Sequence, residues 1–135
     1  MDSSLRTKRL LLAAFCLFIF YLSSRADYPD VRGWYPAWLP EPNLVVHFLL
    51  YAELGALAWN DFRSEPAAWL SNSPLAAAIF FCALYGLSDE IHQVYVPGRV
   101  FQVRDLAADF LGGAFGATAW KTVVERLRWP PGGVR

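Results

Sequence analysis

Residues Pro74–Leu87 read PLAAAIFFCALYGL, and they run directly into the polar stretch Ser88–Asp109, SDEIHQVYVPGRVFQVRDLAAD. A second apolar run, Leu106–Trp120, overlaps the end of this stretch. Acids, bases and a histidine therefore crowd one junction, although the chain is 56% hydrophobic with a mean hydropathy of +0.27. Charged side chains beside long apolar runs need a specific reason to be there. The sequence thus predicts that function lies at this junction.

Four segments carry almost no charge: Leu10–Leu22, Leu44–Trp59, Pro74–Leu87 and Leu106–Trp120. The first is apolar on every side, which is typical of a buried or membrane helix. Each segment is shorter than the roughly 20 residues that cross a bilayer, but extension into its flanks supplies the missing length. We therefore predict an all-α polytopic membrane protein with a bundle of four transmembrane helices. A soluble four-helix bundle is the alternative, and it would need polar helix faces that these segments lack.

Basic residues predict how these helices are oriented. Of the 12 Lys and Arg residues, eight fall in the N-terminal tail, the second loop and the C-terminal tail, and four in the first and third loops. The positive-inside rule then places both termini in the cytoplasm. We predict a cytoplasmic tail at residues 1–9, a membrane domain at 10–124 and a disordered cytoplasmic tail at 125–135. A cleaved secretory signal is the alternative for the first span.

Composition argues against several other classes of function. The net charge is zero, so no global field indicates nucleic-acid binding. Cys16 and Cys82 lie inside apolar runs without a CxxC neighbour, which predicts neither a disulfide nor a metal role. His92 and Asp89 are residue types that bind metals, but the chain has no HExxH or similar spacing. The sequence predicts no metal and no cofactor.

Helix geometry gathers ionisable side chains at one end of the predicted bundle. His47 lies near the outer end of the second segment, whereas Glu53, six residues later, points about 240° away. In the four-span arrangement, the outer ends of the second, third and fourth helices share one depth with the third loop. The residues that we expect to meet there are His47, Asp89, Glu90, His92, Gln93, Arg99, Arg104, Asp105 and Asp109. All of them except His92 are predicted ligand-binding residues.

Three interpretations of this group remain open. The first is a salt-bridged network that only ties the third loop to the helix ends. The second is a pocket for an amphiphilic or lipid-linked molecule, in which Arg99 and Arg104 orient the anionic part and Glu90, Gln93 and His47 complete the site. The third is an enzyme acting on a lipid-linked phosphate or ester, with His47, His92 or Glu90 as the catalytic candidate. We favour the binding pocket, with the lipid bilayer as the surrounding partner.

The motif GGxxG, formed by Gly112, Gly113 and Gly116, lies in the last apolar segment. Small residues let helices approach each other closely. We interpret the motif first as packing within the chain and second as the seam of a homo-oligomer.

The combined pattern resembles the VanZ-like membrane protein family. The stretch DEIHQVYVPGR at residues 89–99, then Asp105 and a glycine-rich final helix, matches the family's arrangement, and so does His47 in LVVHFLLYAELGAL. The resemblance covers roughly Pro42–Ala119, most of the chain. It implies a small multi-pass protein of the bacterial inner membrane that acts near the cell envelope. The family is named for a protein associated with low-level teicoplanin resistance, and the resemblance adds no reaction, substrate or cofactor.

This chain departs from the family pattern at two places. Members usually carry Asp-Lys where this chain has Asn43 and Leu44, so a lysine that could bind an anion is missing. They usually carry Asn at the position of Asp109, which adds a negative charge here. From this charge we predict that Asp109 is protonated or paired with Arg99 or Arg104.

Overall fold

A computed structural model describes residues 3–26, 36, 38 and 40–128. It contains four long helices and one short helix: α1 Ser3–Ser23, α2 Pro42–Phe62, α3 Ala68–Ser71, α4 Pro74–Gln93 and α5 Val103–Arg128. These described ranges include no β-strand. The all-α prediction is therefore confirmed.

Each long helix contains one predicted apolar segment and extends beyond it. Pro42 and Pro74 begin α2 and α4, where the missing proline N–H costs no helical hydrogen bond. The predicted extension of the apolar segments into their flanks is seen in α4, which continues beyond Leu87 to Gln93. The sequence did not predict α3, since four residues are too few to show helical periodicity.

The helices also reach into the segments that we predicted to be tails. α1 begins at Ser3, and its Lys8 donates a hydrogen bond of 2.7 Å to Ser64 Oγ, while Arg9 forms an ion pair with Glu65. α5 continues to Arg128. Residues 3–9 are therefore helical and have partners across the bundle. Residues 125–128 are helical because α5 continues through them without a break. The predicted disorder at 129–135 lies outside the described residues.

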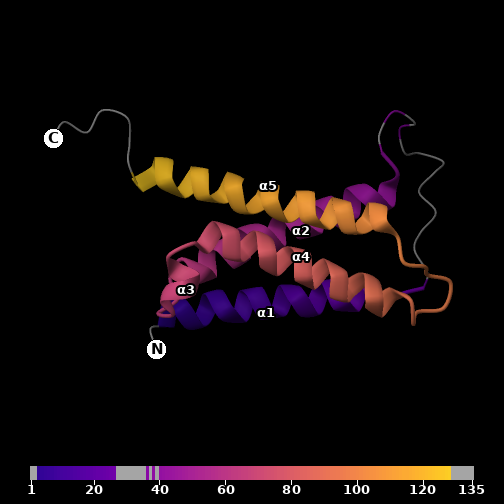
Figure 1. Cartoon of the computed structure of the whole chain (residues 1–135), viewed down its shortest axis with the longest axis horizontal. Coiled ribbons are helices and arrows are strands. Elements are labelled where there is room, and N and C mark those ends of the chain that lie inside the picture. The colour runs from indigo at the N-terminus through magenta and orange to yellow at the C-terminus, as the bar shows by residue number, and fades with distance from the viewer. Residues whose placement is uncertain (1–2, 27–35, 37, 39, 129–135) are drawn as a thin grey trace.

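The four long helices lie side by side and alternate in direction (Figure 1). The start of α1, the end of α2, the start of α4 and the end of α5 share one end with α3, which we call the α3 end. The opposite end, which we call the loop end, contains the end of α1, the start of α2, the end of α4, the start of α5 and the loop 94–102. This arrangement brings residues far apart in sequence to the same end.

The most extensive contact among the described helices joins α2 and α5, and glycines make it possible. A Cβ atom added to Gly112 would overlap the carbonyl oxygen of Phe48, and one added to Gly116 would overlap that of Ala52. Gly55 in turn faces the backbone of Gly113. The predicted packing role within the chain is confirmed. Association between copies through Gly112, Gly113 and Gly116 stays a prediction, and these residues are buried inside one chain.

The outer surface of the bundle is strongly apolar. Every long helix exposes large hydrophobic side chains, for example Leu17, Leu49, Phe80 and Phe115. Soluble monomers rarely expose apolar surface on this scale, whereas contact with lipid requires it. By length and composition, one of the described helices, α4, is able to cross a membrane. That the other three long helices also cross a membrane stays a prediction.

Candidate functional site

A buried group of charged side chains, which we call the polar cluster, lies at the loop end. It consists of His47 from α2, Glu90 from α4, and Asp105 and Asp109 from α5. Glu90 and Asp109 have an exposed fraction of 0%, Asp105 of 2% and His47 of 6%. Charged groups are almost never buried this deeply unless they are paired. The helices therefore hold these four side chains together at a considerable cost in desolvation.

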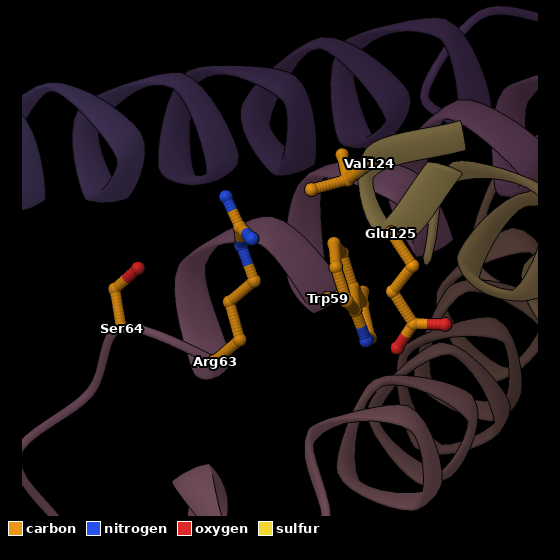
Figure 2. A pocket seen from close by; sticks show the side chains of 5 residues that line it. All are labelled: Trp59, Arg63, Ser64, Val124 and Glu125. Carbon is orange, nitrogen blue, oxygen red and sulfur yellow. The ribbon is translucent and has the colours of Figure 1, made fainter. Parts of the chain in front are cut away.

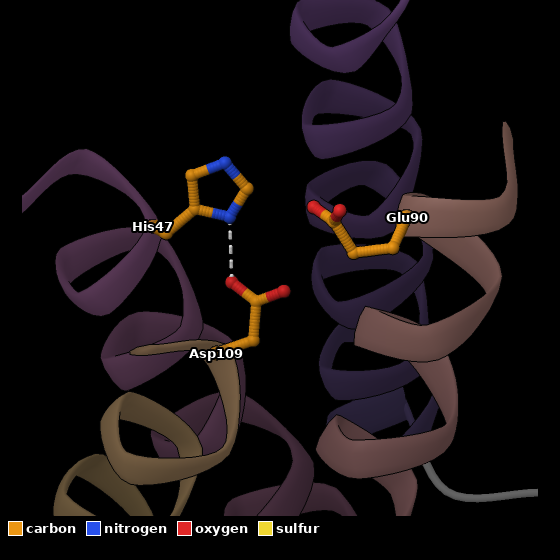
Figure 3. Close-up of side chains that lie close together, drawn as sticks. All are labelled: His47, Glu90 and Asp109. Atoms are coloured by element: carbon orange, nitrogen blue, oxygen red, sulfur yellow. Dashed lines mark hydrogen bonds and ion pairs between the residues drawn. The ribbon is translucent and has the colours of Figure 1, made fainter. Parts of the chain in front are cut away.

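His47 lies between the two aspartates of α5, and Figure 3 shows its contact with one of them, Asp109. Its Nδ1 is 2.8 Å from Asp109 Oδ1, and its Nε2 is 3.6 Å from Asp105 Oδ2. Asp105 and Asp109 are four residues apart, so they share one face of α5 and stand on either side of the ring. In the neutral ring, Nδ1 carries the proton and donates it to Asp109, so Nε2 is the acceptor. This tautomer is assigned from the hydrogen bond.

Asn43 fixes Asp105 from the same face of α2. Its Nδ2 donates a hydrogen bond of 2.7 Å to Asp105 Oδ2. Asp105 also lies in the first turn of α5, where the helix dipole stabilises a negative charge. Our sequence reasoning treated Asn43 only as a departure from the family pattern. The signal that would have found it is its spacing of four residues from His47, which places both on one helix face.

Glu90 completes the polar cluster from the last turn of α4. Its Oε2 accepts a hydrogen bond of 2.8 Å from the backbone N–H of Gln102, which ties the loop 94–102 to the site. Its carboxylate extends from α4 toward the His47–Asp109 pair (Figure 3). One ligand-type atom from each of His47, Glu90 and Asp109 lies within 4.8 Å of the other two. Three helices thus aim one nitrogen and two oxygens at a common volume.

Asp89, the neighbour of Glu90, turns toward α1 instead. Its Oδ2 accepts hydrogen bonds from Ser23 Oγ at 2.7 Å and from Gln93 Nε2 at 3.2 Å. Consecutive helix residues point about 100° apart, so the acid pair serves two different contacts. Asp89 therefore attaches α4 to the end of α1, with Gln93 holding Asp89 from one turn along α4, and Ser23 is a partner that we did not predict.

His92 also faces α1. Its Nε2 is 3.0 Å from Ser24 Oγ, and its ring lies 4.4 Å from the ring of Phe20 between centroids. The structure therefore separates the two predicted catalytic histidines: His47 belongs to the polar cluster, whereas His92 contacts α1. Glu53 is exposed on α2, in agreement with its predicted rotation away from His47.

Arg104 differs from its predicted position. Its side chain is 76% exposed, and its Nη1 lies 3.8 Å from Glu41 Oε1, a surface pair that contributes little stability. Arg99 is half-buried and follows Gly98, whose φ of +80° makes a turn in the loop 94–102. Asp109 forms an ion pair with His47. The other predicted state, a protonated Asp109, stays a prediction. Arg104 is five residues from Asp109 and so points about 140° away on the helix.

Two apolar grooves flank α5 near the polar cluster. The groove between α2 and α5 has a volume of about 460 Å³ and is lined by Leu44, Phe48, Ala108 and Leu111, with Arg104 at its loop end. The groove between α4 and α5 has a volume of about 450 Å³ and includes Leu87, Leu106 and Phe110. Both run along the helices on the outer surface of the bundle. Either could hold a hydrocarbon chain.

The α3 end is different in character. A hollow of about 240 Å³ is lined by Trp59, Arg63, Ser64, Val124 and Glu125 (Figure 2). The guanidinium of Arg63 lies 4.8 Å from the centre of the Trp59 ring. This contact is a cation–π interaction at the end of α2, and Trp59 itself is buried.

Comparison with known proteins gives a match at the level of the family. A family described as VanZ/LLP1 matches residues 9–124. This range includes every residue of the polar cluster. The comparisons with curated proteins and with solved structures give no match. Proteins of the VanZ type are generally membrane-associated. Because the match covers most of the 135 residues, the chain belongs to the VanZ/LLP1 family.

Proposed function

We propose that this protein crosses the bacterial inner membrane four times, with both termini in the cytoplasm, and binds an amphiphilic, lipid-linked or lipid-tailed molecule at the loop end. The apolar outer surface of all four long helices supports the membrane arrangement. The basic α1 start and the Arg63–Trp59 contact at the α3 end support its orientation.

The α2–α5 groove is the observation that carries the binding proposal. Its walls are apolar side chains, and the one cationic residue in its lining, Arg104, lies at the loop end. Such a groove matches a molecule with a hydrocarbon tail and an anionic head, because the tail is buried against the helices while the guanidinium binds the head. This proposal revises the predicted pocket: Arg104 acts from the groove mouth, whereas Asp89 contacts α1 and Gln93 contacts Asp89.

The position of the polar cluster strengthens this proposal. His47 follows the groove residue Leu44 by three positions and precedes Phe48, so the polar cluster lies directly behind the groove wall. On α5, Asp105 directly follows the lining residue Arg104, and Asp109 directly follows the lining residue Ala108. A head group held at Arg104 would therefore lie on the outer side of the wall that the polar cluster backs.

The test is to identify the lipids that co-purify with the full chain in mild detergent. We expect an anionic amphiphile in the wild type, its loss in Arg104→Ala, and partial retention in Arg104→Lys. Ala108→Trp, which fills the groove without changing charge, should also displace it. Arg63→Ala at the α3 end is the control and should leave retention unchanged. Equal retention in Arg104→Ala, Ala108→Trp and wild type would refute the proposal.

A second candidate is an enzyme that acts on a lipid-linked phosphate or ester. The observation in its favour is the 2.8 Å hydrogen bond between His47 and Asp109, because a carboxylate that holds Nδ1–H orients the other nitrogen as a base. In this case His47→Gln should abolish turnover of a lipid phosphate while lipid retention persists. An unchanged rate in His47→Gln would leave the polar cluster without a catalytic role.

A further inference from the structure

Two carboxylate oxygens of the polar cluster have no hydrogen-bond partner among the residues that the structure describes. They are Glu90 Oε1 and Asp109 Oδ2, and both belong to side chains with an exposed fraction of 0%. A buried carboxylate oxygen without a partner is strongly destabilising, so a native structure normally supplies one. We propose that the polar cluster binds one divalent transition-metal cation, with His47, Glu90 and Asp109 as ligands and Asp105 beside them.

The donor atoms are already close to the spacing that a metal ion requires. The three ligand atoms of His47, Glu90 and Asp109 lie within 4.8 Å of one another. Two ligands of a tetrahedral zinc ion with bonds of about 2.0–2.1 Å stand roughly 3.3 Å apart. The separation of 2.8 Å between His47 Nδ1 and Asp109 Oδ1 is of this order. Small side-chain rotations would therefore complete the site without movement of the helices.

Asp105 prepares His47 for this role. Metal-binding histidines generally donate their other ring N–H to a carboxylate or carbonyl, which fixes the tautomer and makes the ligating nitrogen more basic. Asp105 Oδ2 lies 3.6 Å from Nε2 and is placed to accept this proton. Nδ1, which lies 2.8 Å from Asp109 Oδ1, is then left to bind the metal together with Asp109.

Charge balance also favours a divalent cation. Asp105, Asp109 and Glu90 carry up to three negative charges in a buried volume. With His47 as a neutral ligand, a divalent cation offsets two of these charges. Without a cation, protons must neutralise these acids, because isolated buried carboxylates are too costly to keep.

The ligand types narrow the choice of metal. Mg²⁺ and Ca²⁺ prefer sites made entirely of oxygen, whereas imidazole suits Zn²⁺ and its neighbours in the first transition series. One nitrogen with two or three carboxylates is a mixed set that fits Zn²⁺ or Mn²⁺. The sequence could not indicate a metal site here, because the ligands come from three helices and form no motif. The proposal does not depend on the amphiphile described above.

The first test measures metal binding to the purified full chain. After treatment with a chelator, we expect wild type to take up one equivalent of Zn²⁺ or Mn²⁺ and to gain thermal stability, with little response to Mg²⁺. Glu90→Gln and Asp109→Asn keep side-chain shape but should weaken binding by about tenfold or more. Asp61→Asn removes another buried carboxylate, at the α3 end, and should leave binding unchanged. If wild type bound the metal no more tightly than Glu90→Gln, the proposal would be overturned. The acids of the polar cluster would then be neutralised by protons.

A second test needs no substitution in the polar cluster and so does not depend on the folding of its variants. Pulsed electron paramagnetic resonance of bound Mn²⁺ detects the nitrogen of a coordinated imidazole. The chain has two histidines, so the variant His92→Gln leaves His47 as the one candidate. We expect the nitrogen signal in both wild type and His92→Gln. Bound Mn²⁺ without a nitrogen signal, or a signal that disappears in His92→Gln, would contradict coordination by His47.

Discussion

His47 is the side chain on which the polar cluster depends, because it joins α2 to both aspartates of α5. Helical spacing was enough to predict that His47 and the acids of α4 and α5 would gather at one end. It was not enough to predict their pairing. Asp89 and Glu90 are adjacent in sequence, yet they contact α1 and the polar cluster respectively, and only the rotation of α4 decides which acid goes where.

A single substitution at Asn43 tests the contacts around Asp105. Asn43→Asp replaces a donated hydrogen bond with two carboxylates in contact, so we expect the free energy of unfolding to fall by about 1–3 kcal/mol. The control is Asn60→Asp on the same helix, where Asn60 Oδ1 accepts from Arg63 and an added charge is favourable. Thermal unfolding in detergent compares the two. Equal stability of Asn43→Asp and Asn60→Asp would show that Asn43 does not face Asp105.

At the scale of the elements, apolar runs predicted all four long helices, because a run of this length has few alternatives to a helix. Their ends were less predictable. α1 and α5 extend through polar residues because Lys8 and Arg9 find partners near the end of α2 and Lys121 pairs with Glu125. Such contacts depend on the tertiary arrangement, and hydropathy carries no sign of them.

The α2–α5 contact yields a prediction at this scale. Gly116→Leu should destabilise the protein by about 1–3 kcal/mol or more, because its side chain would collide with the backbone of Ala52. Thr118 is exposed two residues later on the same helix, so Thr118→Leu is the matched control and should have little effect. Unfolding in detergent measures both variants. A stable Gly116→Leu would mean that the two helices lie farther apart.

For the whole molecule, the two ends of the bundle differ in chemistry. The α3 end has surface cations and tryptophan, and the loop end has the polar cluster and the mouth of the α2–α5 groove. In the membrane arrangement that we propose, the polar cluster would lie on the outer side. A ligand of the cell envelope would then reach it without entering the cytoplasm.

Cysteine labelling in intact cells tests this orientation. Tyr95 in the loop 94–102 and Trp69 in α3 are both strongly exposed. A membrane-impermeant maleimide should label Tyr95→Cys in intact cells and Trp69→Cys only after the cells are opened. The parent chain, with Cys16 and Cys82 alone, gives the background. The reverse pattern would place the loop end in the cytoplasm.

The measurement that bears most directly on the polar cluster is a double-mutant cycle between His47 and Asp109. Unfolding free energies of His47→Ala, Asp109→Ala and the double variant give the coupling between α2 and α5. Because the two side chains share a buried hydrogen bond of 2.8 Å, we predict a coupling of about 1 kcal/mol or more. Strictly additive effects would mean that the two residues do not meet, and the polar cluster would lose its centre.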